Sequence, residues 1–100
     1  SGYREKYYQR AVAFEFRKRG LHFEEQVAIP LSYKDISPGK CFLDFLVDNK
    51  IILEIKKDEK FSRKHIEQVC SYLKASGLKL GLIANFTKDG VKFKRLLNIN

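Results

Sequence analysis

The stretch CFLDFLVDNKIILEIKK, residues 41–57, contains three charged side chains that look out of place in its apolar segments. Asp44 stands between a leucine and a phenylalanine, while Glu54 and Lys56 alternate with a leucine and an isoleucine. Side chains alternate across a strand, so two strands here would carry one wholly apolar face and all three charges on the other. Two acids and a lysine would then converge on one patch of the sheet.

The chemistry of such a patch follows from its ligand atoms. Two neighbouring carboxylates repel each other unless a cation lies between them, and oxygen ligands without histidine or cysteine select Mg²⁺ or Mn²⁺. Such an ion polarises a phosphoryl oxygen, and Lys56 beside it would hold the attacking water and offset charge developing on the phosphate. The pattern favours metal-assisted phosphodiester hydrolysis, with an ordinary sheet face carrying a salt bridge as the alternative.

The turn between the two strands decides whether Asp44 and Glu54 meet. Directly opposed residues of an antiparallel pair lie on one face, so these acids can be opposed only if paired positions add up to an even number. A two-residue turn would place Glu54 on the apolar face. The pattern therefore predicts a three-residue turn at positions 48–50 that pairs Val47 with Ile51, or else a compensating bulge.

The elements around this pair follow from periodicity and from glycine and proline signals. The order is helix, three strands, helix, strand, which predicts an α/β fold with a mixed sheet flanked by helices. The tight turn makes the second and third strands antiparallel, and the helical crossover allows the third and fourth to be parallel. The tail, residues 91–97, stays open between helix and strand. The expected bounds are helices at 3–19 and 62–75, strands at 22–29, 41–48, 51–57 and 78–86, and a loop at 32–40.

The first helix shows a broad apolar stripe. Glu5 lies at the edge of the stripe, whereas Glu15 falls near its middle and is expected as a buried acid satisfied by a lysine or a backbone amide. The stripe consists of Tyr3, Tyr7, Ala11 and Phe14, widened by Tyr8, Val12 and Phe16.

Length and composition bound the class of protein. One hundred residues, 44% of them hydrophobic, predict a single folded domain, residues 1–100. Twenty Lys and Arg against twelve Asp and Glu give a net charge of +8, which favours a polyanionic partner such as nucleic acid.

Cys41 and Cys70 lack the spacing of a zinc site or disulfide framework, and no signal or membrane segment is evident, so a cytoplasmic location is expected. The first residue is Ser1 rather than Met, which leaves upstream trimming open.

A basic segment, KKDEKFSRKH, follows the charged patch at residues 56–65. Beside a metal site its cations would bind flanking phosphates without reading sequence, although a charge run is also typical of a solvated loop. In the next helix three polar residues share one face, which is either a solvated face or part of the site. The cations are Lys57, Lys60, Arg63 and Lys64, and the polar residues are His65, Gln68 and Tyr72.

These residues resemble a known nuclease superfamily. Asp44, followed after nine residues by Glu54-Ile55-Lys56, resembles the D…(D/E)xK core of the PD-(D/E)XK nuclease superfamily. The order of helices and strands resembles the αβββαβ core of its restriction-endonuclease-like fold. More specifically, Gly2-x-x-Glu5-x-x-Tyr8 and the segments GLHFEEQVAIPLSYK, DFLVDNKIILEIK and HIEQVCSYLKASGLKLGLIANF resemble the GxxExxY family over nearly the whole chain.

The resemblance implies a role for each residue of the patch. Asp44 and Glu54 match the metal-binding acids, and Lys56 matches the catalytic lysine. The carbonyl of Ile55 matches the usual main-chain metal ligand. Glu5 occupies the place of the first-helix acid that some members use.

The second helix adds a further resemblance. Gln68-x-x-x-Tyr72 is similar to the QxxxY motif of RecB-type exonucleases, which faces the active site and makes Gln68 a catalytic candidate. His65 and Tyr72 are nucleic-acid-binding candidates. Two departures stand out: Leu43 replaces the proline of the motif's name, and the helix that usually precedes the GxxExxY segment is absent.

The leading hypothesis is a nuclease dependent on Mg²⁺ or Mn²⁺ that leaves a 5′-phosphate and a 3′-hydroxyl, as the superfamily does. The alternative is a catalytically idle nucleic-acid-binding or protein-interaction module on the same fold. Retention of Asp44, Glu54 and Lys56 together favours the enzyme. DNA is favoured over RNA as the partner, and a homodimer stays open as an oligomeric state.

Overall fold

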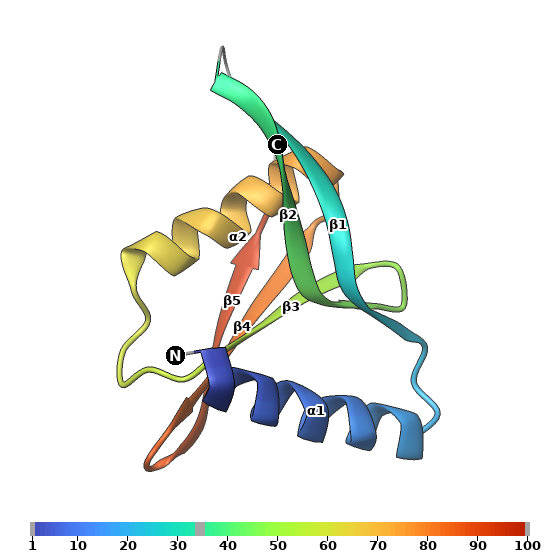
Figure 1. Cartoon of the computed structure of the whole chain (residues 1–100), viewed down its shortest axis with the longest axis vertical. Helices are drawn as coiled ribbons and strands as arrows, with labels where there is room; N and C mark the ends of the chain where they lie inside the picture. The colour runs from blue at the N-terminus through green and yellow to red at the C-terminus, as the bar shows by residue number, and fades with distance from the viewer. Residues whose placement is uncertain (1, 34–35, 100) are drawn as a thin grey trace.

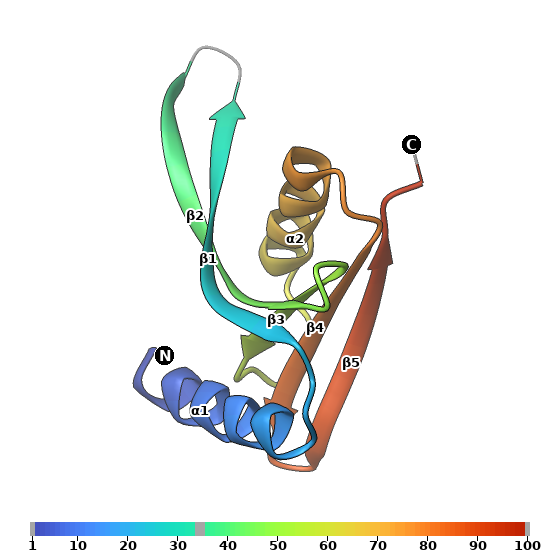
Figure 2. The same cartoon turned by 90° about the vertical axis from the view of Figure 1, so that its right-hand side faces the viewer.

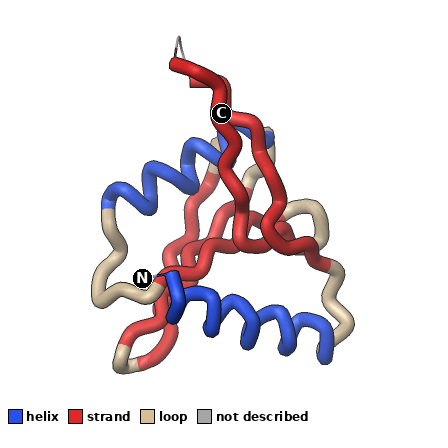
Figure 3. The backbone as a smooth tube through the Cα atoms, viewed as in Figure 1, coloured by secondary structure: helices blue, strands red, loops and turns tan. Residues whose placement is uncertain are grey.

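A computed structural model describes the backbone of residues 2–33 and 36–99 and the side chains of residues 4–29 and 41–99. It contains two helices and a five-stranded mixed sheet with strand order β1-β2-β3-β4-β5 (Figures 1 and 3). Only β3 and β4 run parallel, joined by the crossover through α2. In chain order the elements are α1 (Gly2–Lys18), β1 (Phe23–Tyr33), β2 (Ile36–Val47), β3 (Ile51–Lys56), α2 (Arg63–Ser76), β4 (Leu80–Thr87) and β5 (Gly90–Leu97).

The two helices cover opposite faces of the sheet, so the central strands are buried on both sides. On one face α1 packs over a cluster that includes Phe45, Leu53 and Ile55. On the other face α2 packs over a cluster that includes Leu43 and Ile52. The wholly apolar face predicted for β3 lies under α1, and the opposite face, predicted to carry the charges, also contributes Ile52 to a second hydrophobic cluster.

The separation of Leu43 from Phe45 has a local cause. These residues were expected on one face, yet Leu43 packs on the α2 side and Phe45 on the α1 side. Gln26, level with Asp44 across the β1–β2 pair, has a left-handed backbone with φ of 50°. Figure 2 shows β1 and β2 bending away from the rest of the sheet toward α2. The bend turns the strands between these two residues and places Asp44 at the corner.

The predicted three-residue turn between β2 and β3 is confirmed. Val47 pairs with Ile51, and Phe45 pairs with Leu53. The Lys50 N–H closes the turn on the Val47 carbonyl at 3.0 Å, with φ of 54° at both Asp48 and Asn49. Asp44 and Glu54 therefore occupy opposed positions.

The loop expected at 32–40 is replaced by a longer hairpin. β1 and β2 pair out to Leu31 with Gly39, and β2 begins at Ile36. Pro30 is accommodated because β1 is an edge strand, where a missing N–H need not leave a ladder position unpaired. The tail, left open between helix and strand, forms β5, which pairs antiparallel with β4.

The first helix uses a different part of its stripe from the one expected. Tyr8, Val12 and Phe16 face the sheet, while Tyr7 and Phe14 are more than 60% exposed. Glu15 is also exposed and pairs with Arg19 at 3.3 Å, so the expectation of a buried acid is wrong. An amphipathic helix with apolar residues on most of its circumference can rotate, and packing against the sheet selects the face.

The second helix lies within one residue of its expected bounds because its caps are explicit in the sequence. The Ser62 hydroxyl accepts a hydrogen bond from the His65 N–H at 3.0 Å and begins the helix. Gly77, with φ of 76°, ends it. Neither helix of the described residues has the length and apolarity required to cross a membrane.

Candidate active site

The two acids interlock where β2 and β3 separate. The ladder between these strands ends at the Phe45–Leu53 pair. Beyond it the Asp44 N–H donates to Glu54 Oε2, and the Ile55 N–H donates to Asp44 Oδ2, both at 2.8 Å. Each carboxylate accepts a hydrogen bond from a main-chain N–H of the opposite strand with one of its oxygens. These two hydrogen bonds hold both acids in place through the backbone.

Both acids are largely buried, so keeping them as two anions would destabilise the folded protein. Glu54 is only 3% exposed, and burial together with the charge of Asp44 raises its pKa to about 8. Burial likewise raises the pKa of Asp44, against the opposing effects of the Ile55 N–H and the Lys56 charge. Near neutral pH the pair retains a proton unless a cation replaces it. A divalent cation would remove both the repulsion and the need for that proton.

Lys56 ends β3 on the same side as Glu54, two residues further along. Its ammonium lowers the pKa of both acids, which places its charge within electrostatic reach of each. The side chain is half-buried. The predicted convergence of Asp44, Glu54 and Lys56 on one patch is therefore present in the fold.

A buried asparagine fixes the loop that leaves the site. Asn85 of β4 is level with Lys56, is 1% exposed, and accepts a hydrogen bond from the Asp58 N–H at 2.7 Å. The Asp58 carboxylate lies 3.5 Å from His65 Nδ1 at the start of α2. Burial and the Lys56 charge lower the pKa of His65. No periodicity or motif singles out Asn85, although an amide inside the apolar run LGLIANF is a usable signal.

Glu5 lies near the acid pair without completing a group of three. It lines a cleft of about 460 Å³ together with Asp44, and its charge raises the pKa of Asp44 and of Glu54. Within residues 4–29 and 41–99, no three His, Cys, Asp or Glu side chains are grouped closely enough to hold a metal ion. The available donors are therefore two carboxylates and the Ile55 carbonyl, with Glu5 farther out.

The polar face of α2 divides into an exposed and a buried part. Tyr72 is 3% exposed, and burial and the nearby Glu54 charge raise the pKa of its hydroxyl. Its burial leaves it no surface for the nucleic-acid contact expected from the sequence. Gln68, one turn earlier on the same face, is half-buried.

The basic segment surrounds the start of α2. Lys60, Arg63 and Lys64 are exposed, while Lys57 is half-buried. None of these four forms an ion pair with an acid of the residues whose side chains are described. Their charges are therefore available to a ligand.

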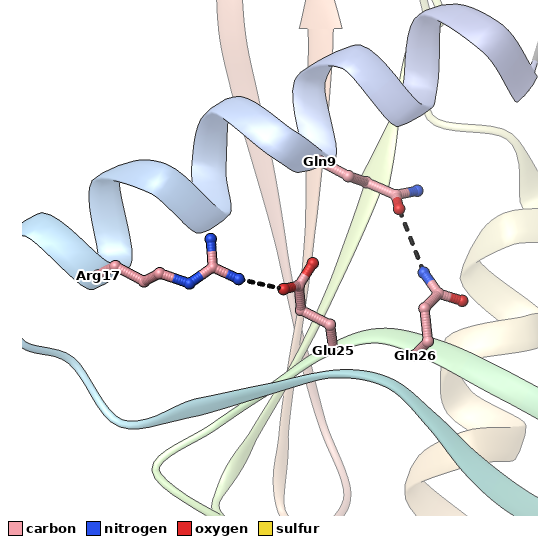
Figure 4. A network of polar contacts seen from close by, with 4 residues as sticks. All are labelled: Gln9, Arg17, Glu25 and Gln26. Atoms are coloured by element: carbon pink, nitrogen blue, oxygen red, sulfur yellow. Dashed lines mark hydrogen bonds and ion pairs between the residues drawn. The ribbon is translucent and has the colours of Figure 1, made fainter.

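Two polar contacts join α1 to β1 beside the site (Figure 4). Gln26 Nε2 donates to Gln9 Oε1 at 3.2 Å, and Arg17 pairs with Glu25 at 2.8 Å. Neither glutamine stands out in the sequence, because no periodicity reveals that β1 turns left-handed at Gln26. These contacts fix the helix that carries Glu5 over the edge of the sheet.

Comparisons with known proteins agree with this fold. A family model described as the PD-(D/E)XK nuclease superfamily matches residues 1–96. Among solved structures, SSO0001 aligns with a TM-score of 0.74 at 15% identity, and the alignment covers 93% of this chain and 49% of the SSO0001 chain. An alkaline exonuclease from Laribacter hongkongensis aligns with a TM-score of 0.64 at 16% identity, covering 89% of this chain and 53% of its own.

The structure of the Laribacter enzyme in complex with dAMP aligns with a TM-score of 0.63 at 15% identity, covering 89% of this chain and 53% of the enzyme. At these identities the likeness concerns the fold, and it confirms the predicted fold class. The chain spans about half the length of these structural relatives. No curated protein matches the chain in sequence.

Proposed function

Because the chain belongs to the PD-(D/E)XK nuclease superfamily, we propose that it hydrolyses phosphodiester bonds of nucleic acid with a divalent metal ion. The observation that carries the proposal is the interlocked acid pair, Asp44 and Glu54, with Lys56 two residues beyond. Two buried acids with raised pKa values are a poor structural device, because burying unpaired charge destabilises a fold. They are well suited as ligands for a cation, since their hydrogen bonds to the backbone already fix their positions.

The donor set fits a hard divalent ion. Asp44, Glu54 and the Ile55 carbonyl offer oxygen atoms, which favour Mg²⁺ or Mn²⁺ over metals that prefer nitrogen or sulfur. A bound ion of this kind supplies Lewis-acid polarisation of the scissile phosphate. Glu5 stands farther from the pair and would act through water molecules in the cleft.

The remaining residues would handle water and charge. The Lys56 ammonium holds the attacking water and offsets charge that develops on the phosphate. Hydrolysis transfers the water's hydroxyl to phosphorus and a proton to the departing 3′ oxygen, which leaves a 5′-phosphate and a 3′-hydroxyl. Gln68 would orient groups at the mouth of the site.

Nucleic acid is the proposed partner, with DNA favoured over RNA. The uncommitted cations Lys57, Lys60, Arg63 and Lys64, with His65, would bind phosphates on the side of the site next to α2. The free N–H groups at the start of α2 add to this attraction. The complex of the Laribacter enzyme with dAMP supports a nucleic-acid partner.

Within the superfamily we place the chain in the GxxExxY group. The support is the segment Gly2-x-x-Glu5-x-x-Tyr8, whose Glu5 lines the cleft with Asp44. Tyr8 of the same segment stacks on Phe86 with ring centroids 4.3 Å apart, which attaches this helix to β4.

One experiment separates the nuclease from an idle module. Asp44→Asn should abolish Mn²⁺ binding and cleavage while leaving the protein as stable or more stable, because the change removes repulsion together with a ligand. Lys56→Ala should spare much of the Mn²⁺ binding and lower cleavage roughly 10²-fold or more. The measurements are Mn²⁺ calorimetry, thermal unfolding, and degradation of labelled DNA and RNA with Mg²⁺ or Mn²⁺, with and without chelator.

Asp48→Asn and Lys88→Ala serve as matched controls, since both residues are exposed and lie in turns. Neither should change Mn²⁺ binding or cleavage. Equal Mn²⁺ binding by wild type and Asp44→Asn would reject the nuclease. A salt-bridge cluster would instead show a loss of stability in both site variants and no change in the metal titration.

A further inference from the structure

The cleft beside the acid pair is bounded by α1 on one side and by β1 and β2 on the other. Its volume of about 460 Å³ falls in the range of roughly 300–1,000 Å³ that is typical of small-ligand sites. Four of its lining residues come from two successive turns of α1, and Asp44 contributes from β2. A ligand in this cleft would therefore reach one of the proposed metal ligands directly.

The cleft contains two cations without a structural role. Lys6 and Arg10 are one helical turn apart, where like charges repel, and neither pairs with an acid among the side chains of residues 4–29 and 41–99. Glu25, also in the lining, is already paired with Arg17 at 2.8 Å. Glu5 and Asp44, which also line the cleft, are candidate metal ligands under the proposed function. The two cations are free to bind an anion.

Two amides cross the same cleft. Gln26 donates one amide proton to Gln9 Oε1 at 3.2 Å, and its side chain also lies close enough to Asp44 to lower the pKa of that carboxyl; the Gln26 carbonyl oxygen and the Gln9 amide N–H groups remain for a ligand. Glutamine amides can match the edge of a base, which presents both donors and acceptors. The left-handed backbone at Gln26, costly for a residue other than glycine, directs this side chain into the cleft.

We propose that this cleft takes one unpaired nucleotide next to the scissile phosphate, with Lys6 and Arg10 on its phosphate and Gln9 and Gln26 on its base. A base stacked in an intact duplex would have to leave the helix first, at a cost of about a few kcal/mol. The inference rests on the proposed nuclease function and names its substrate class: single strands, overhangs and frayed ends in preference to uninterrupted duplex. The strand would continue from this cleft across the acids toward the basic segment at α2.

The test compares binding of a labelled single strand with binding of the same sequence as a blunt duplex. We would measure fluorescence anisotropy at several salt concentrations, with chelator present so that no strand is cut. Wild type should bind the single strand more tightly than the duplex. Lys6→Ala/Arg10→Ala should weaken single-strand binding roughly 10-fold or more and lower the slope of log K against log salt by about 1.4, the value expected for two lost contacts.

Gln9→Ala should act differently, because an amide does not neutralise a phosphate. It should lower the ratio of single-strand to duplex affinity roughly 5-fold and leave the salt slope unchanged. Lys74→Ala/Lys79→Ala removes the same charge from exposed positions outside the cleft and is the matched control. Thermal unfolding would verify that each variant is folded.

Equal or tighter binding of the duplex by wild type would overturn the inference. So would a Lys6/Arg10 variant that matches the Lys74/Lys79 control. The nuclease proposal is tested separately by cleavage. Single-strand preference without metal-dependent cleavage would support the nucleotide site in the cleft and contradict the nuclease activity. Cleavage without single-strand preference would support the nuclease activity and contradict the nucleotide site in the cleft.

Discussion

Glu54 should make the metal-free protein less stable as the pH rises. Its folded-state pKa of about 8 lies above the ordinary value of 4.5, so the folded protein holds this proton more tightly than the unfolded chain. The resulting stabilisation is fully present below about pH 4.5 and is lost as the pH rises toward about 8. The loss should be on the order of a few kcal/mol. Urea unfolding in chelator at about pH 5 and about pH 9 measures it.

Glu54→Gln should flatten this pH dependence, because the neutral amide needs no proton. Glu15→Gln, at an exposed position, should leave it unchanged. The comparison between variants removes contributions from other titrating groups. A pH dependence that is the same in wild type and Glu54→Gln would contradict the buried, protonated acid.

The acid pair could be predicted from sequence because it depends on short-range rules. Alternation along a strand and the length of one turn sufficed to place Asp44 opposite Glu54. Gln26 and Asn85 could not be assigned in this way. The site uses Gln26 because β1 bends at that residue, and Asn85 because a loop from elsewhere in the chain donates to it. Both depend on tertiary contacts that leave no periodic signal.

At the level of elements, the contact between β4 and α2 depends on a glycine. A Cβ at Gly81 would meet Val69 Cγ1 of α2 at 2.7 Å and Leu73 Cδ1 at 3.4 Å. Gly81→Ala should therefore destabilise the protein by about 1–3 kcal/mol through overpacking, as measured by urea unfolding. It should also lower cleavage, because α2 carries Gln68 and Tyr72.

Val69→Ala provides the internal test of that cause. Removing the methyl groups of Val69 makes room for the new Cβ, so the double variant should be less destabilised than the sum of the single variants by about 0.5 kcal/mol or more. Strict additivity would show that the cost of Gly81→Ala arises elsewhere, for example from strand propensity.

The elements that sequence reasoning missed are those that depend on pairing between distant residues. The range 32–40 has the composition of a loop, yet much of it is extended because β1 supplies a partner strand. β5 has weak periodicity, with exposed Val91 and Phe93, and its strand conformation comes from pairing with β4. The helix at 63–76, in contrast, was predictable because Ser62 and Gly77 cap it locally.

For the whole molecule, the net charge of +8 matters through where the cations lie. The proposed track, meaning the path of the nucleic-acid strand across the surface, has Lys6 and Arg10 on the α1 side of the acids and the basic segment on the α2 side. The acids between them repel a polyanion until a metal ion binds. Nucleic-acid binding should therefore strengthen when Mg²⁺ or Mn²⁺ occupies the site, beyond any general effect of ionic strength.

The last prediction concerns the α2 side of this track. Lys60→Ala/Arg63→Ala/Lys64→Ala should weaken nucleic-acid binding and lower the slope of log K against log salt by about one unit per lost phosphate contact. The fold should be as stable or more stable, because cations at the N-terminal end of a helix oppose its dipole. Lys74→Ala/Lys79→Ala/Lys88→Ala removes an equal charge from exposed positions elsewhere and should change the slope far less. Anisotropy titrations at several salt concentrations and thermal unfolding test both statements. Equal slopes for the two triple variants would show that binding follows net charge alone and that the start of α2 is not part of the binding surface.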